Sequence, residues 1–202
     1  VRLIYVGRIS AEKNVDYLVD EFLALGEAAP ARLYFVGDGP YRVALQEKVW
    51  GLGAQGRFSF TGFLEGEALA VAYASADLFV FPSTTDTFGN VVLEAQASGL
   101  PAIVSHEGGP PELIVPGETG LVVDVGEEGE LASALSHLIE HEAERRAMGS
   151  AARSHSLRFG WDQVLDGLWQ GLDLAAALSS EGSTGRALAP EEPEPGVVGA
   201  LR

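Results

Sequence analysis

The fold is decided by residues 78–101, which read LFVFPSTTDTFGNVVLEAQASGLP. Leu78 to Phe81 is a short apolar run, typical of a strand that is buried on both faces. The next residue is a proline, which cannot donate to a sheet ladder, and a polar, turn-prone loop follows it. The pattern then predicts a helix over Asn90 to Ser98, ended by Gly99 in the left-handed conformation with Pro101 just beyond. The stretch therefore predicts strand, loop and helix in succession.

Two acidic residues frame this unit. Asp86 lies in the loop, and Glu94 lies about one turn inside the predicted helix. The amides of Phe88, Gly89 and Asn90 lie at or before the helix N-terminus, where several lack intrahelical acceptors and can donate to a bound oxygen. Carboxylates can accept from vicinal hydroxyls, so the combination suits a polyol beside a phosphate, as in a nucleotide sugar. Acids near a helix N-terminus also favour the helix dipole on its own, and the spacing alone favours that simpler interpretation.

The full string of residues is a more specific signal for function than the spacing of the two acids alone. It resembles the donor-binding signature of the retaining glycosyltransferases of family 4, which have the two-domain GT-B architecture. The matching positions are Asp86, Phe88-Gly89, Glu94-Ala95, Gly99 and Pro101. The family usually has Glu at the first acidic position. Asp is one methylene shorter, so the charge is kept and the reach changes.

The loop after the first predicted strand carries two cations. Val1 to Val6 is the strand, and Gly7 ends it; Arg8 and Lys13 follow before a helix that Asn14 is expected to cap. Two cations at the ligand edge of a sheet would neutralise a diphosphate, Arg through a fork of donors and Lys as a point charge. A single surface cation is usually only solvated. The string Gly-Arg, four residues, Lys-Asn nevertheless resembles the diphosphate loop of the same family.

Two further segments resemble parts of this family's nucleotide site. Ala31 to Val36 is a predicted strand, and Gly37 then begins a Gly-Asp-Gly-Pro turn in which Pro40 is expected at the first helical position. The turn lacks the third glycine of a dinucleotide fingerprint, but it resembles the family's glycine-rich turn. Another predicted strand, Arg57 to Thr61, leads into Thr61-Gly62-Phe63. That segment resembles the one along the nucleotide base, where backbone groups would read the base edge.

About six predicted strands alternate with helices along the chain. This predicts an α/β fold with a doubly wound, Rossmann-like parallel sheet, and the resemblance implies the C-terminal half of a GT-B fold. Residues 1–175, including a last amphipathic helix over Trp161 to Leu174, are expected to form the donor-binding domain. Residues 176–202 are expected to be a disordered tail. Because a strand begins at once at Val1, we expect an N-terminal acceptor domain to be missing from this chain.

The composition excludes several classes of protein. The chain has 202 residues, 47% of them hydrophobic, which is enough for one domain with a core. It has no run of about 18 apolar residues, so no membrane span is expected. Its net charge of −16 disfavours binding to nucleic acid and to anionic lipid. The absence of cysteine excludes disulfides and is consistent with a cytoplasmic protein, which could also lie at the inner face of the membrane through the missing domain.

The histidines give no strong signal for catalysis or metal binding. His106 lies near the predicted site, but a lone loop histidine is more often exposed than catalytic. His137 and His141 are four apart and could share a helix face, but without a third ligand nearby we expect them to be exposed to solvent. The resemblance implies that no metal or other cofactor is needed.

The resemblance implies a hexosyltransferase of glycan biosynthesis. It would move a hexose from a UDP- or GDP-sugar to a hydroxyl of a glycan or lipid-linked acceptor, with retention at the anomeric carbon. Arg8 and Lys13 would hold the diphosphate and offset charge on the leaving group. Asp86 would accept from donor-sugar hydroxyls and Glu94 from ribose hydroxyls. Because the acceptor would be bound mainly by the missing domain, this chain alone is expected to be inactive in transfer.

Other functions remain open on the sequence. A non-catalytic nucleotide-sugar-binding or regulatory module is supported by Asp in place of Glu at position 86, whereas the retained Arg8, Lys13 and Glu94 argue against it. A phosphorylase or a sugar epimerase could share the architecture. The phosphorylase would need a buried pyridoxal lysine, and the chain has only Lys13, already placed in the diphosphate loop, and Lys48.

Overall fold

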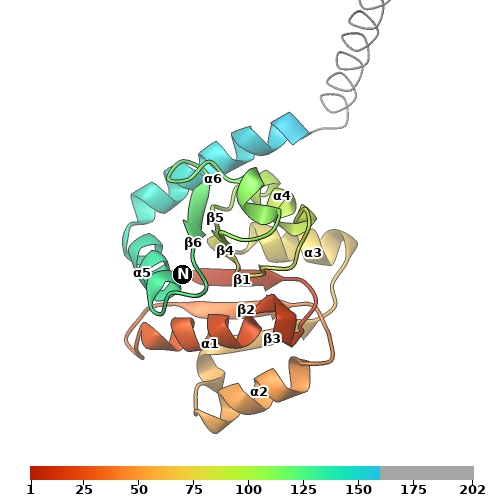
Figure 1. Cartoon of the computed structure of the whole chain (residues 1–202), viewed down its shortest axis with the longest axis vertical. Coiled ribbons are helices and arrows are strands. Elements are labelled where there is room, and N and C mark those ends of the chain that lie inside the picture. The colour runs from red at the N-terminus through yellow and green to blue at the C-terminus, as the bar shows by residue number, and fades with distance from the viewer. Residues whose placement is uncertain (160–202) are drawn as a thin grey trace, which may run out of the picture. The chain divides into compact units, whose positions relative to one another are not determined.

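The computed structural model describes residues 1–159, which are built around a six-stranded sheet. All strand pairs are parallel, and the order is β3-β2-β1-β4-β5-β6 (Figure 1). The strands are β1 Arg2–Val6, β2 Arg32–Val36, β3 Phe58–Gly62, β4 Leu78–Phe81, β5 Ala102–Ser105 and β6 Gly120–Val123. The predicted α/β fold with a doubly wound parallel sheet is therefore confirmed. The helix expected over residues 161–174 and the tail expected over residues 176–202 lie outside the described residues.

Helices cover both faces of the sheet. In Figure 1, α1, α2 and α5 lie on one side, whereas α3, α4 and α6 lie on the other, and contacts of α1 with α2 and α5 and of α4 with α6 agree. The helices are α1 Val15–Ala24, α2 Arg42–Gly51, α3 Gly66–Ala74, α4 Asn90–Ala97, α5 Glu130–Glu140 and α6 Glu142–Ser156. Short 3₁₀ turns are η1 Ala11–Lys13, η2 Gln55–Arg57, η3 Pro110–Leu113 and η4 Leu157–Phe159.

The core explains why the strands are so apolar. Every residue of β4 and β5 is buried, because each of these strands has a strand on both sides and helices above and below. At the centre, Leu3 of β1 pairs with Leu33 of β2 on one side and with Leu78 of β4 on the other, and none of the three is exposed. The strand order reverses between β1 and β4, so their following loops diverge toward opposite faces. Open α/β sheets bind ligands at such a point.

Most predicted element boundaries agree with the structure, but one local prediction is wrong and another is confirmed only in part. Pro40 lies in the turn after β2, since α2 begins only at Arg42. Asn14 occupies the N-cap position of α1, as predicted, and its carbonyl oxygen accepts from the amide of Leu18 at 3.0 Å, but its side chain does not cap the helix. It has a left-handed backbone (φ 54°), and its side-chain amide donates to the carbonyl oxygen of Pro82 at 3.0 Å. The polar side chain that the sequence suggests as a helix cap is therefore used to fasten the loop after β1 to the loop after β4.

A buried carboxylate joins two helices on the same face of the sheet. Glu21 of α1 is only 6% exposed, and its two oxygens accept from the amides of Gly129 at 3.1 Å and Ala132 at 2.9 Å. These amides open α5 and lack helical acceptors, so the carboxylate caps the positive end of that helix. At the other end of α5, the buried Arg145 donates to the carbonyl oxygen of Leu138 at 2.5 Å. Both ends of α5 are thus capped from outside the helix.

The Glu21 cap gives a stability prediction. We expect Glu21→Ala to lower the free energy of unfolding by about 2 kcal/mol, because it leaves two part-buried amides without acceptors. Glu21→Gln keeps one carbonyl oxygen and should cost less. Urea unfolding followed by circular dichroism measures both changes. The exposed Glu128→Ala is the matched control, and equal stability of Glu21→Ala and this control would contradict the cap.

Candidate functional site

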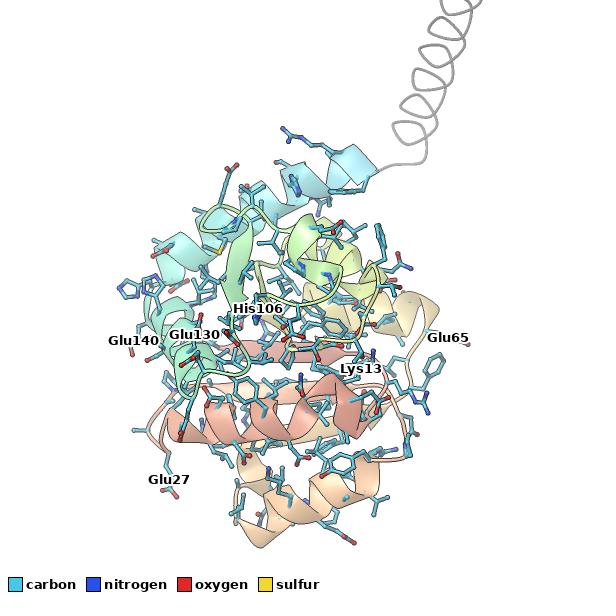
Figure 2. All side chains as sticks on the ribbon, viewed as in Figure 1. Lys13, Glu27, Glu65, His106, Glu130 and Glu140 are labelled. Carbon is cyan, nitrogen blue, oxygen red and sulfur yellow. The ribbon has the colours of Figure 1, made fainter. Side chains whose placement is uncertain are left out.

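Two adjoining hollows lie at the carboxyl edge of the sheet, where the strand order reverses. Their volumes are about 490 and about 540 Å³. They share Val6, Gly7 and Arg8 at the end of β1 and Val91 on α4. Figure 2 shows Lys13 and Glu65, one from each hollow, on the same edge of the molecule, opposite Glu27. The two hollows form one continuous cleft along this edge.

The first hollow, of about 490 Å³, is built by backbone segments that touch one another. It lies between the turn at Gly37, the segment from Phe63 to Gly66 and Glu94 on α4. The amide of Gly7 donates to the carbonyl oxygen of Val36 at 3.0 Å, and the amide of Gly37 donates to that of Gly62 at 2.9 Å. The ends of β1, β2 and β3 are therefore fastened side by side.

Glycine is required at these contacts. A Cβ on Gly37, whose φ is +139°, would lie 1.9 Å from the carbonyl oxygen of Gly7. A Cβ on Gly39 would lie 2.2 Å from the carbonyl oxygen of Ile9. The glycine-rich turn is thus explained first by close approach of two backbones, which places Gly37 against the floor of the cleft.

The second hollow, of about 540 Å³, contains a shielded ion pair between its two walls. Lys13 Nζ lies 2.8 Å from Asp86 Oδ2 and 3.0 Å from Thr85 Oγ1. The side chains are only 16% (Lys13) and 28% (Asp86) exposed. The wholly buried hydroxyl of Ser83 donates to the same oxygen of Asp86. The cation of the first loop is therefore neutralised by the acid of the other loop.

Arg8 is the exposed cation of this cleft. It lines both hollows, and within residues 1–159 its side chain makes no ion pair. Its carbonyl oxygen accepts from the hydroxyl of Tyr5 at 2.9 Å. Burial, together with the nearby charges of Asp86 and Glu12, raises the pKa of Tyr5 well above its ordinary value. The hydroxyl therefore stays protonated and holds the backbone of Arg8 at neutral pH.

The start of α4 presents backbone donors to the second hollow. Gly89 has φ +91°, and the amides of Phe88, Gly89 and Asn90 have no hydrogen-bond acceptor among residues 1–159. The loop that carries them is held from behind, because the amide of Gly109 donates to the carbonyl oxygen of Asp86 at 2.8 Å. Unpaired amides at a positive helix end favour an anion.

The structure brings nearly all the predicted site residues to this cleft. Gly7, Arg8, Gly37 and Glu94 line the first hollow, and the second is lined by Gly7, Arg8, Lys13, Asp86, Phe88, Gly89 and Asn90. Thr61 and Gly62 line neither hollow. Thr61 faces a separate cavity of about 270 Å³ beside α3, and Gly62 contributes a carbonyl oxygen to the backbone contacts beneath the cleft. Their neighbour Phe63 lines the first hollow and is 72% exposed.

Three residues that hold the site residues in place were not predicted from the sequence. Ser83 holds Asp86, Tyr5 supports Arg8, and Tyr73 of α3 donates to Glu94 at 2.9 Å. Ser83 could have been suspected from its place in the loop, but nothing in the pattern distinguishes the two tyrosines from ordinary core residues.

The histidines lie outside the cleft. His106 is exposed, with Nδ1 at 3.6 Å from Asp124 Oδ1. His137 and His141 are exposed, as predicted, and their rings stack with centroids 4.4 Å apart. Within residues 1–159, no three His, Cys, Asp or Glu side chains gather as metal ligands. Over the same residues, no helix combines the length and apolarity needed to cross a membrane.

The fold and the cleft define an α/β domain of Rossmann type with its candidate site at the switch point of the sheet. The family described as "Glycosyl transferases group 1" matches residues 1–155, and the chain belongs to this family.

Two relatives are similar over most of the chain. Sulfoquinovosyl transferase SQD2 of Arabidopsis thaliana is 39% identical over 162 residues, which are 79% of this chain and 30% of the relative. A GDP-mannose-dependent alpha-mannosyltransferase of Mycolicibacterium smegmatis is 44% identical over 165 residues, 81% of this chain and 40% of the relative. The chain thus spans less than half the length of either.

Solved structures show the same architecture. Sucrose-phosphate synthase from Thermosynechococcus elongatus has a TM-score of 0.74 at 30% identity, covering 86% of this chain and 46% of that one. Anabaena Alr3699/HepE, solved in complex with UDP, has a TM-score of 0.72 at 26% identity, covering 89% and 48%. These neighbours are glycosyltransferases of GT-B architecture, in agreement with the fold and the family.

The close approach of Gly37 to Gly7 gives a second stability prediction. We expect Gly37→Ala to destabilise the fold by more than about 2 kcal/mol, because the new methyl group would overlap a backbone oxygen. Gly51→Ala is the control, since a Cβ there meets nothing within 4 Å. It should be neutral or slightly stabilising. Thermal unfolding compares the two, and an unchanged melting temperature for Gly37→Ala would contradict the backbone contact.

Proposed function

We propose that residues 1–159 contain the donor site of a retaining glycosyltransferase of family 4, in the C-terminal half of a GT-B enzyme. One observation carries the proposal: Arg8 and Lys13 share a hollow with the unpaired amides of Phe88, Gly89 and Asn90. Two cations and the positive end of a helix are what a diphosphate needs. Glu12 and Asp86 line the same hollow, so the unpaired amides that open α4 supply the excess of positive charge.

The two hollows suit the two ends of a nucleoside diphosphate sugar. In this proposal the diphosphate lies beside Arg8, which borders both hollows. The sugar lies in the second hollow, where Asp86 accepts from its hydroxyls. The nucleoside lies in the first hollow, with Glu94 at the ribose and the backbone near Phe63 at the base. Two similar proteins support a UDP- or GDP-sugar, because one is named as GDP-mannose-dependent and the other was solved with UDP.

The chemistry follows from the charges. When the bond between the anomeric carbon and the diphosphate oxygen breaks, negative charge accumulates on the leaving nucleoside diphosphate. Arg8, Lys13 and the helix amides would stabilise that charge in place, which is the main source of catalysis in many transfer reactions. The leaving phosphate would take the proton of the acceptor hydroxyl, and the hexose would be transferred with retention. We assign no metal to this step, because the protein's own cations offset the diphosphate. Acceptor contacts would come from another part of a longer protein.

Nucleotide titration tests the donor site directly. In calorimetry of the 202-residue chain with UDP, GDP and ADP, we expect saturable, weak binding of UDP or GDP. Arg8→Ala should weaken that binding by about tenfold or more, since a charge-assisted fork is lost. Glu94→Ala should also weaken it. The affinity should be the same in Mg²⁺ and in EDTA.

Arg153→Ala, an exposed cation on α6, is the charge control and should bind as the wild type does. No binding of any of the three nucleotides at millimolar concentration would contradict the proposed donor site. Binding that is insensitive to Arg8→Ala would place the nucleotide elsewhere.

The ion pair of Lys13 with Asp86 predicts an unusual response. Asp86→Asn removes the charge that competes with phosphate for Lys13, so bare UDP or GDP should bind about threefold to tenfold more tightly. The corresponding nucleotide sugar should gain less, because Asp86 is also proposed to accept from its hydroxyls. Calorimetry of both ligands gives the ratio. The control is Asp20→Asn, which removes a carboxylate of α1 from its ion pair with Lys48 of α2. Equal weakening of both ligands by Asp86→Asn would contradict this role.

A further inference from the structure

Tyr73 is a buried tyrosine at the end of α3. It is 3% exposed, and its ring lies beside that of Phe79, with the centroids 6.2 Å apart. A phenylalanine would pack in this place equally well. A buried hydroxyl needs a hydrogen-bond partner, so the tyrosine calls for an explanation beyond packing.

The partner of this hydroxyl is a carboxylate of the cleft. The Tyr73 oxygen lies 2.9 Å from Glu94 Oε2 and 3.4 Å from the carbonyl oxygen of Val91. The hydroxyl has one hydrogen, and the shorter distance and the negative charge both favour Glu94 as acceptor. Burial, and then the charge of Glu94, raise the pKa of Tyr73 well above its ordinary value. It therefore remains a donor throughout the physiological pH range.

Glu94 has little else to hold it. It is exposed on α4, it lines the first hollow, and the Tyr73 hydroxyl is the only hydrogen-bond partner of its carboxylate among residues 1–159. A glutamate side chain without a partner samples many rotamers, and ordering it on ligand binding costs conformational entropy. A bond to Oε2 limits this freedom before the ligand arrives and leaves Oε1 available to it.

We propose that Tyr73 is a positioning residue that orders Glu94 for the vicinal hydroxyls of the donor's ribose. This inference rests on the proposed function, and it adds a residue that does not itself touch the ligand. Tyr73 sets the selectivity for ribose over sugars that lack these hydroxyls, because only a hydroxylated pentose gains from an ordered carboxylate. The backbone sites for base and diphosphate do not depend on it.

The test compares ribose with dideoxyribose. Calorimetry would use UDP and GDP, each beside its 2′,3′-dideoxy form, with the wild type and Tyr73→Phe. We expect Tyr73→Phe to weaken binding of the ribonucleotide by about threefold to tenfold and to change that of the dideoxy form by less than about twofold. In a Glu94→Ala background, Tyr73→Phe should have no further effect. Tyr17→Phe, which removes a hydroxyl bonded to the backbone of Glu127 on the other face, should leave the selectivity unchanged.

A second readout needs no nucleotide. Three-bond scalar couplings of Glu94 in labelled protein should report one dominant side-chain rotamer in the wild type and averaged rotamers in Tyr73→Phe. Unchanged couplings would overturn the anchoring role. The ribose role would be overturned if Tyr73→Phe lowered the affinity for the ribonucleotide and for its dideoxy form equally. It would also be overturned if Tyr73→Phe lowered the affinity as much in the Glu94→Ala background as in the wild type. Failure of the wild type to bind either ribonucleotide would overturn the proposed function as well, whereas the other outcomes leave that function standing.

Discussion

The whole site depends on one topological constraint, the reversal of strand order between β1 and β4. Adjacent parallel strands end at the same edge, and here their loops turn to helices on opposite faces of the sheet. The gap between the two loops cannot be closed by either helix, so it remains as a cleft. Arg8 and Lys13 enter it from one loop, and Asp86 and the amides that open α4 enter it from the other.

The cleft can attract an anion only at a few groups. Five acids line its two hollows (Glu12, Asp38, Glu65, Asp86 and Glu94) beside the two cations Arg8 and Lys13. A net charge of −16 repels an anionic ligand, so attraction has to be local. In the absence of a ligand, the charge of Lys13 is neutralised, because its side chain is shielded and paired with Asp86. A diphosphate would have to replace a carboxylate that the buried hydroxyl of Ser83 keeps in place. The carboxylate therefore competes with phosphate for the same cation.

The sequence predicts those features whose cause is local. The apolar run of β4, the helix that follows it and the left-handed Gly99 (φ +80°) are found where the pattern predicts them. The cleft residues could be grouped because parallel strands end at one edge. The features that the sequence did not predict are hydrogen bonds between residues that are far apart in the chain. The side chain of Asn14 bonds to Pro82 rather than to an amide of its own helix, Glu21 caps residues 108 and 111 positions away, and Tyr73 bonds to Glu94 of the next helix. No periodicity records such contacts, because they are decided by the packing of elements.

The contact between the backbones at Gly7 and Gly37 also limits how this cleft can diverge among relatives. A turn that admits no side chain cannot acquire a new ligand contact by mutation, and the neighbouring strand end is held just as tightly. Side chains can be exchanged more freely at the rim, where Phe63 is 72% exposed and borders the same hollow. A floor that admits no side chain, below a rim that does, would let the ligand contacts change without altering the fold.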